Sequence, residues 1–125
     1  MDKRFYITTP IYYPSARPHM GHAYSSIIAD FFARFKRMDG FDVQFLTGTD
    51  EHGLKIQRSA EKQNIDPLEF CNQISQTFRD LSKTLNLTNT DFIRTTEERH
   101  QKTVQHLWNE LEKNDDIYLS KYSGW

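Results

Sequence analysis

Two kinds of hydrophobic pattern alternate along the chain. Phe5 to Thr8 is a short, mostly apolar run, which predicts a buried β-strand. From Ala23 to Met38 the apolar residues recur every three or four positions, the spacing of one face of an α-helix. Val43 to Thr47 is again mostly apolar and predicts a second strand with both faces covered. The apolar residues of the helical stripe are Tyr24, Ile27, Ile28, Phe31, Phe32, Phe35 and Met38.

Two more helices are predicted after the second strand. The first covers residues 54–63, and residues 64–67 interrupt the pattern. Asp66 is the predicted N-cap of the second helix, because Pro67 follows at the first helical position and Glu69 three residues after the cap. The apolar side of that helix is formed by Leu68, Cys71, Ile74, Phe78, Leu81 and Leu85.

The last third of the sequence predicts a strand, a helix and the start of another strand. The third strand is expected at residues 91–94, and Thr95 is expected to cap a helix with Glu98 at the capping-box distance. Residues 117–122 alternate like a fourth strand. The order β-α-β-α-α-β-α-β predicts an α/β fold with a doubly wound, mostly parallel sheet. The predicted inner face of the last helix comprises Val104, Leu107, Trp108 and Leu111.

Composition limits the class of protein. The chain has 125 residues, 37% of them hydrophobic, which suits one domain with a modest core. Its 16 basic and 17 acidic residues balance, so no overall positive charge indicates nucleic-acid binding, although a local patch remains open. Cys71 is the only cysteine, which excludes an internal disulfide and favours a packed core thiol. With no signal peptide and no apolar run near the ~20 residues of a membrane span, we expect a cytoplasmic protein without a membrane partner.

A proline-rich loop between the first strand and the first helix carries two histidines. His19 and His22 lie three positions apart, on one face of the predicted helix, with Gly21 between them. Helix N-termini present unpaired N–H groups and a partial positive charge, so phosphate groups bind there. Gly21 has no side chain and lets a flat ring or a phosphate approach the backbone. The pattern alone is weak, and its position between a strand and a helix is what indicates a nucleotide site.

A polar loop from Gly48 to Gly53 follows the second predicted strand. If the first two strands are neighbours, Asp50 in this loop faces the histidine loop across a shared crevice. A carboxylate there can hold a substrate ammonium group, and the alternative is a turn residue that caps the next helix. Joint metal ligation by Asp50, Glu51 and His52 is disfavoured, because adjacent side chains rarely converge on one ion. Tyr13, between the strand and the histidines, is placed to line a pocket.

Several segments together carry a resemblance to a known family. They are Ile7-Thr8-Thr9-Pro10-Ile11-Tyr12-Tyr13, Pro18-His19-Met20-Gly21-His22-Ala23-Tyr24, Leu46-Thr47-Gly48-Thr49-Asp50-Glu51-His52-Gly53 and the run from Phe92 to His100. These segments resemble the methionyl-tRNA synthetases, which are class I aminoacyl-tRNA synthetases. The His-x-Gly-His pattern is common to class I, whereas the Thr-Gly-Thr-Asp-Glu-His-Gly loop is specific to the methionine enzymes. The resemblance extends over essentially the whole chain.

This resemblance implies a Rossmann-like class I synthetase catalytic fold and a two-step reaction. ATP and methionine give methionyl-adenylate, and the methionyl group then passes to the 3′ adenosine of tRNA. The implied catalytic and ATP-binding residues are His19 and His22, with Gly21 beneath the adenine. The implied methionine-binding residues are Ile11, Tyr13 and Asp50, of which Asp50 holds the α-ammonium group. Mg²⁺ is expected with ATP, and no metal site is expected within this chain.

The sequence departs from the family in what it lacks. No lysine-rich Lys-Met-Ser-Lys-Ser loop occurs, and the remaining sheet strands, the anticodon-binding helical domain and most of the connective insertion have no counterpart. We therefore expect residues 1–114 to be the N-terminal half of the catalytic domain. Residues 115–125, which end at Gly124-Trp125, are expected to open the connective insertion. Such a fragment is expected to be inactive alone.

Other functions remain alternatives at this point. Another class I synthetase, or a small nucleotidyltransferase with the same His-x-Gly-His helix, would respond to an amino acid other than methionine or to none. A non-catalytic interaction module would unfold cooperatively on heating, with a melting temperature that ATP and methionine do not change. A metal hydrolase would hold a stoichiometric ion, with His19, His22, Asp50 and His52 as its ligands.

Overall fold

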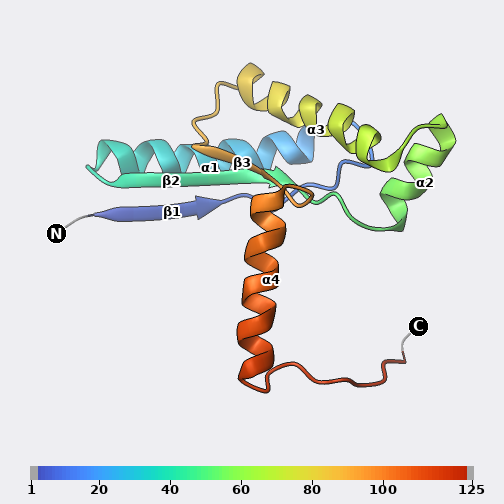
Figure 1. Ribbon diagram of the computed structural model, residues 1–125. Helices are drawn as coiled ribbons and strands as arrows, with labels where there is room; N and C mark the ends of the chain where they lie inside the picture. The colour runs from blue at the N-terminus through green and yellow to red at the C-terminus, as the bar shows by residue number, and fades with distance from the viewer. Residues whose placement is uncertain (1–2, 124–125) are drawn as a thin grey trace. The chain divides into compact units, whose positions relative to one another are not determined.

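Strands and helices alternate in the first of two units of the chain. The structure is a computed structural model that describes residues 3–123, so the first two residues and the final Gly124-Trp125 lie outside the described part. Unit 1 is Met1–Thr95 and unit 2 is Thr96–Trp125. Unit 1 contains, in order, β1 (Arg4–Thr8), α1 (Met20–Met38), β2 (Asp42–Thr49), α2 (Leu54–Gln63), α3 (Pro67–Thr84) and β3 (Asp91–Arg94) (Figure 1).

The strands of unit 1 form a parallel sheet in the order β1-β2-β3. Thr8 pairs with Leu46, and further along β2 the residue Thr49 pairs with Arg94. The hydroxyl groups of Thr9 and Thr47 lie 2.7 Å apart, which ties the end of β1 to its neighbour. The predicted α/β class with a parallel sheet is confirmed. Because parallel strands point the same way, the loops that follow β1, β2 and β3 open at the same edge.

Strand β2 is longer than the sequence predicts. Gly48 and Thr49 were expected in a loop, but both pair with β3, and an additional bridge joins Thr49 to Tyr12. Glycine is required here by close approach, because a Cβ on Gly48 would stand 2.0 Å from the carbonyl oxygen of Ile93. Strand β2 therefore continues past the end of its apolar run, because β3 and the segment at Tyr12 pair with its last residues.

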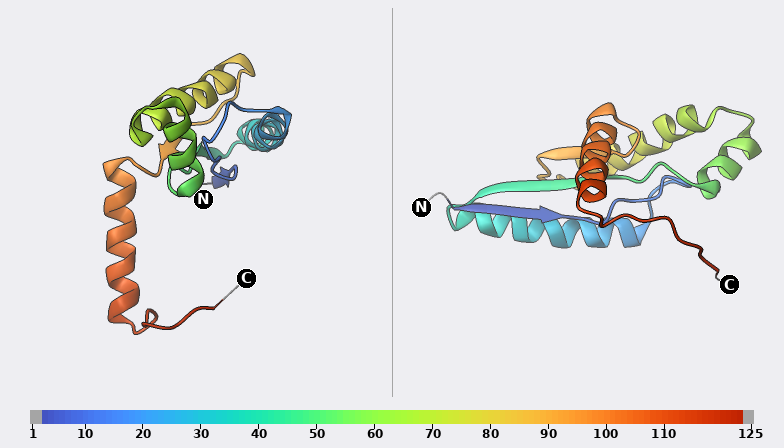
Figure 2. Two further views of the ribbon diagram at one scale, coloured as in Figure 1. Left: turned by 90° about the vertical axis from the view of Figure 1, so that its right-hand side faces the viewer. Right: turned by 60° about the horizontal axis from the view of Figure 1, so that its bottom comes forward.

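Helix α1 packs through its small residues and not through its aromatic stripe. Ala29 and Ala33 are buried against Val43 and Phe45 of β2, and the helix lies lengthwise along β1 and β2 (Figure 2). Small side chains let a helix approach a sheet closely, which explains the choice of face. The stripe predicted from the sequence marks a helix correctly, yet it faces outward in unit 1. Its exposed members are Tyr24, Ile27, Ile28, Phe31, Phe32, Phe35 and Met38.

A second core forms between α2 and α3. Ile56 and Ala60 of α2 are buried together with Phe70 and Cys71 of α3. The predicted cap of α3 is confirmed: a side-chain oxygen of Asp66 accepts hydrogen bonds from the first helical N–H groups, at 2.9 and 3.2 Å. Phe78 and Ser75 are also buried on α3, whereas Leu68, expected on the inner side, is exposed because it lies in the first turn beside the cap. This core packs α2 against α3 within unit 1.

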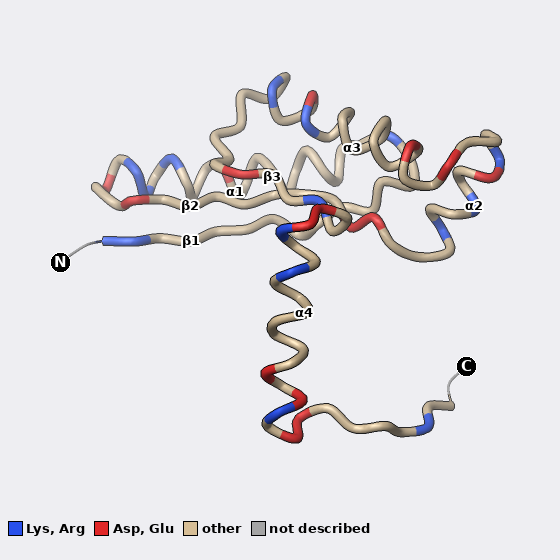
Figure 3. Tube along the Cα trace, viewed as in Figure 1, with Lys and Arg blue, Asp and Glu red and all other residues tan. Residues whose placement is uncertain are grey.

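Unit 2 contains the helix α4 (Glu98–Lys113). Its acidic and basic residues lie near the two ends of the helix (Figure 3), where pairs such as Lys102 with Glu98, 2.6 Å apart, join successive turns. Two expectations are wrong here. None of the described residues of α4 is buried, so the predicted inner face is exposed, and residues 117–122 form no strand. The boundary expected after residue 114 stays a prediction.

The helices of residues 3–123 are short or polar. Among these described residues, no helix combines the length and the apolar character needed to cross a bilayer.

Candidate functional site

Helix α1 begins at two histidines that cap its first turn reciprocally. His19 is the N-cap residue, and its Nδ1 accepts a hydrogen bond from the N–H of Gly21 at 3.1 Å. The N–H of His19 donates to Nδ1 of His22 at 3.0 Å, which completes a capping box. A ring nitrogen that accepts a hydrogen bond carries no proton, so the proton of each neutral ring lies on Nε2. Each imidazole can therefore donate one N–H to a ligand.

The surroundings of His22 favour its neutral form. Its ring centroid lies 4.7 Å from that of Tyr12 and 5.1 Å from that of Phe78, both edge to face, and 3.9 Å from that of His19. Burial, followed by repulsion from His19, lowers the pKa of His22 below its ordinary value of 6.5. Near neutral pH the ring therefore keeps Nδ1 for the cap and an Nε2–H donor.

Gly21 leaves room for the His19 ring, in addition to its predicted role of letting a ligand approach the backbone. A Cβ at this position would come within 2.9 Å of Cε1 of His19, because that ring folds back over the first turn. The absence of a side chain thus lets His19 reach the Gly21 N–H, and it also leaves the exposed backbone uncovered.

A small pocket lies beside the histidines. Its volume is about 210 Å³, and it brings together His19, His22 and Tyr13, three of the residues singled out from the sequence. The sequence analysis singled out neither Arg17 nor Lys55 as a member of this site. Arg17 lies two positions before His19 in the same loop, whereas Lys55 comes from α2 and only the tertiary fold brings it here. Cationic side chains at a helix N-terminus favour an anionic ligand. The lining residues are Tyr13, Ser15, Ala16, Arg17, His19, His22 and Lys55.

The backbone of Tyr12 joins the two predicted site loops. Its N–H donates to the carbonyl of Gly48, and its own carbonyl accepts from the N–H of Asp50, each at 2.9 Å. The hydroxyl of Tyr12 lies 2.6 Å from that of Ser25 and 3.0 Å from that of Ser26, both on α1. One residue therefore connects the Asp50 loop to the first turns of the histidine helix.

Asp50 does not cap α2, the alternative role considered for it. The N-cap of α2 is Gly53, with φ at 107°, and no side chain bonds to that helix end. Asp50 itself is half-buried at the carboxyl edge of the sheet. Its neighbours point elsewhere: Glu51 pairs with Arg94, and a ring nitrogen of His52 lies 3.4 Å from the carbonyl oxygen of Thr95. Within residues 3–123, no group of three or more acidic, histidine or cysteine side chains is arranged to hold a metal ion.

The remaining predicted residues lie in the loop after β1. Ile11 and Tyr13 flank the buried Tyr12 and are themselves exposed, at 40% and 58% of their surfaces. Tyr13 lines the pocket with the histidines, while Ile11 and Asp50 are not among its lining residues. The structure thus brings Tyr13 and the two histidines into one pocket, and it ties Asp50 to the same edge of the sheet through Tyr12.

Comparison with known proteins gives a consistent result. The model of the family described as tRNA synthetases class I (M) matches residues 5–125. A mitochondrial methionine–tRNA ligase from Takifugu rubripes is 53% identical over 99% of this chain, and the methionine–tRNA ligase of Bacillus subtilis is equally similar. The crystal structure of Mycobacterium tuberculosis methionyl-tRNA synthetase bound by methionyl-adenylate superimposes with a TM-score of 0.94 over 98% of the chain, at 46% identity.

The matches cover this chain almost completely and the relatives only in part. The chain spans 21% of the Takifugu ligase, 19% of the Bacillus ligase and 24% of the Mycobacterium structure. The family model nevertheless extends over nearly every residue described above, including both loops of the site. The chain belongs to the methionine group of the class I tRNA synthetases.

Proposed function

We propose that this chain provides the nucleotide and amino-acid contacts of a methionine–tRNA ligase. In the first step a carboxylate oxygen of methionine attacks the α-phosphorus of ATP, which forms methionyl-adenylate and releases pyrophosphate. In the second step the 3′-terminal adenosine of tRNA takes the methionyl group and AMP leaves. The observation that carries this proposal is the connection through Tyr12 between the histidine-capped start of α1 and the loop of Asp50.

The histidines act on ATP as pre-positioned donors in this proposal. The Nε2–H groups of His19 and His22 donate to phosphate oxygens, at a helix end whose partial charge favours anions. Nucleotidyl transfer needs positioning and stabilisation of charge more than covalent help from the protein. Loss of one such donor is expected to raise the barrier by about 2.7–4 kcal/mol, by analogy with oxyanion-hole donors. The bare backbone at Gly21 accommodates the adenine, and Mg²⁺ belongs to the substrate as the MgATP complex.

The methionine end of the site depends on Asp50. Its carboxylate does not cap α2, and it accepts a charge-assisted hydrogen bond that the α-ammonium group of methionine donates. Ile11 and Tyr13 lie beside the methionine side chain. The further partner is tRNA, and the proposed location is the cytoplasm, which cell fractionation can test.

Methionine-dependent exchange of pyrophosphate with ATP tests this function. The assay uses the longest natural protein that carries this sequence, and methionine, not cysteine or leucine, is expected to support exchange. Asp50→Asn is expected to lower kcat/KM for methionine at least about 100-fold, because a charge-assisted contact to the ammonium group is lost. Exchange with another amino acid, or unchanged kinetics in the variant, would contradict the proposal.

The isolated 125-residue chain offers a second check. It is expected to catalyse no substantial exchange, because the lysine-rich loop of the family has no counterpart in it. Substantial turnover by this chain alone would contradict that expectation.

A further inference from the structure

The backbone of Asp50 and of its two neighbours is held by two other segments of the chain, one at Tyr12 and one at Thr95. The carbonyl of Thr49 accepts from the N–H of Thr95 at 3.2 Å, and the N–H of Asp50 donates to Tyr12 at 2.9 Å. The N–H of Glu51 donates to the hydroxyl of Thr95 at 2.8 Å. Three successive residues are thus fixed, although the sequence alone predicts a loop at this point.

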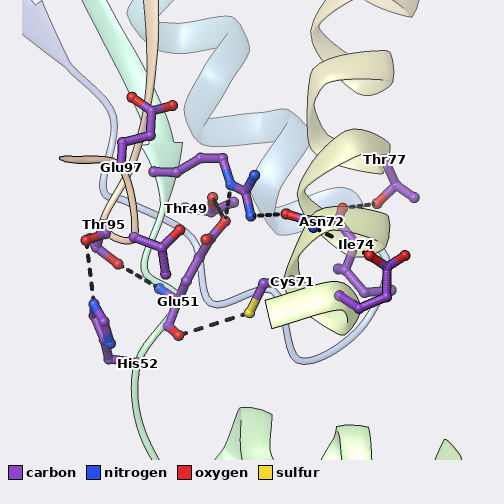
Figure 4. Close-up of polar contacts among 12 residues, drawn as sticks. Thr49, Glu51, His52, Cys71, Asn72, Ile74, Thr77, Thr95 and Glu97 are labelled. Atoms are coloured by element: carbon purple, nitrogen blue, oxygen red, sulfur yellow. Dashed lines mark hydrogen bonds and ion pairs between the residues drawn. The ribbon is translucent and has the colours of Figure 1, made fainter. Parts of the chain in front are cut away.

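The side chain of Glu51 adds a buried ion pair to these contacts. It is fully buried, and its Oε1 accepts from the hydroxyl of Thr49 at 2.8 Å and from Nε of Arg94 at 2.7 Å (Figure 4). The Arg94 side chain is 18% exposed, and it also donates to Oδ1 of Asn72 on α3 at 2.7 Å. A charge buried in this way is stable only while its partners stay in place, so the pair resists displacement of the loop.

Helix α3 holds the same residue from the other side. Sγ of Cys71 lies 3.9 Å from the carbonyl oxygen of Glu51, and the close-up shows Cys71 and Asn72 on α3 facing the Glu51 network (Figure 4). The loop is therefore linked to β3 through Arg94 and to α3 through Cys71 and Asn72. A displacement of any of these elements would move the backbone that carries Asp50.

We propose that the Glu51–Arg94 pair is a positioning device that fixes the Asp50 carboxylate for the ammonium group of the substrate. This inference rests on the proposed function. Glu51 does not touch the substrate itself, because its carboxylate is fully buried and engaged by Thr49 and Arg94. Recognition of an ammonium group depends on a donor–acceptor distance of about 2.7–2.9 Å, so small movements of the Asp50 backbone weaken binding.

The test compares Glu51→Gln and Arg94→Lys with a matched control, Asp30→Asn. Asp30 is likewise a largely buried carboxylate paired with an arginine, but it lies on α1 and contacts the segment before β3. Pyrophosphate exchange is measured for each full-length variant, with separate KM values for methionine and ATP and with the melting temperature. A des-amino analogue of methionine is tested as a competitive inhibitor, because it lacks the group that Asp50 binds.

A positioning role predicts a specific pattern. Both Glu51→Gln and Arg94→Lys are expected to raise KM for methionine about tenfold, the effect of losing about 1.4 kcal/mol of binding, while KM for ATP and the Ki of the des-amino analogue stay within about twofold. The control lowers the melting temperature without changing KM for methionine. Adding Glu51→Gln to Asp50→Asn produces no further rise, because the carboxylate that it positions is already lost.

Other outcomes refute the inference. If both variants change KM for methionine no more than Asp30→Asn does, or weaken the des-amino analogue equally, the pair only supports the fold. If Glu51→Gln does not fold by circular dichroism, Arg94→Lys, which keeps the charge, decides the question. A wild-type protein without methionine-dependent exchange overturns the proposed function itself, whereas normal wild-type exchange with unaffected variants overturns this inference alone.

Discussion

One carboxylate–arginine pair holds the segment before strand β3, and another holds the last residue of that strand. Asp30 pairs with Arg34 one helical turn away, at 2.6 Å, and its other oxygen accepts the N–H and the hydroxyl of Thr88 before the strand. Glu51 pairs with Arg94, the last residue of the strand, at 2.7 Å. The arginine of the first pair is 45% exposed and that of the second 18%. The two ion pairs are therefore almost equally short, but the arginine of the second pair is much less exposed to water.

The first pair joins two residues of one helix, whereas the second joins residues that are distant in the sequence. Arg34 can turn toward water if its partner is lost, because it lies on an exposed helical surface. Arg94 and Glu51 are 43 positions apart in the sequence, and both lose most of their hydration when the loop and the strand come together. Removal of one member of the buried pair takes the opposite charge away from the other member, which is costly in a site largely removed from water. We therefore expect burial, and not the distance between the charged groups, to decide how much each pair stabilises the fold.

The largest expected effect is on stability when each arginine is removed. Arg94→Ala should lower the free energy of unfolding by about 3–5 kcal/mol, because the buried Glu51 carboxylate loses its counter-charge. Arg34→Ala should lower it by less than Arg94→Ala does, because the Asp30 carboxylate keeps the hydrogen bonds from the N–H and the hydroxyl of Thr88. Urea denaturation followed by circular dichroism measures both. Equal losses for the two variants would show that the burial of the pair does not decide its contribution to stability.

Unfolding by acid should show how much the ionised Asp30 carboxylate contributes to the stability of the folded protein. Burial alone would raise the pKa of Asp30, but the hydrogen bonds from Arg34 and Thr88 outweigh it and hold the pKa below the ordinary value of 3.8. The folded state therefore binds this proton less readily than the unfolded chain. The resulting stability is present above the ordinary pKa and is lost as the pH falls through the lowered value.

Asp30→Asn is accordingly expected to flatten the dependence of stability on pH below about pH 4. Urea midpoints of wild type and variant, measured between neutral and strongly acidic pH, test this. A variant that keeps the full acid sensitivity of the wild type would show that Asp30 is not the group responsible.

The smallest effect should be visible in the reactivity of Cys71. Burial, followed by the nearby Glu51 carboxylate, raises the pKa of the Cys71 thiol to about 11, so at pH 8 only about one thiol in a thousand is ionised. Iodoacetamide should modify the folded protein very slowly and the urea-unfolded protein readily. Arg94→Ala removes a positive charge that lowers the pKa of Cys71, but it should still accelerate modification of the folded protein because it loosens the loop over the thiol, whereas Arg34→Ala should not. Mass spectrometry of timed samples gives the rates, and equal rates in the two variants would argue against a link between the pairs.

The sequence predicted the features that depend on neighbouring residues. Strand β3 has the predicted bounds, α2 covers the predicted residues, and Asp66 caps α3 as expected. A cap or a short apolar strand is specified by residues within one turn of each other, so its signal is complete in a short window. The same reasoning found the two histidines at the start of α1, whose capping partners are three positions apart or fewer.

Features that depend on distant residues were missed or misassigned. Thr95 has the sequence of a helix cap, yet its hydroxyl accepts the N–H of Glu51 and α4 begins at Glu98 instead. The Glu51–Arg94 pair and the position of Lys55 beside the histidines arise only when separate elements pack together. The aromatic stripe of α1 shows the limit of periodicity, because a pattern identifies a helical face without stating what covers it.

The mutual capping of the two imidazoles has a practical consequence for protein engineering. Nδ1 of each histidine accepts a hydrogen bond that caps the helix, and Nε2 is available to a ligand. Substitution by asparagine or by glutamine can therefore separate the two roles. Asparagine places an acceptor near the position of Nδ1, whereas glutamine extends its polar atoms to the distance of Nε2. His22→Asn can thus retain the helix start while it removes the distal donor, and His22→Gln does the reverse.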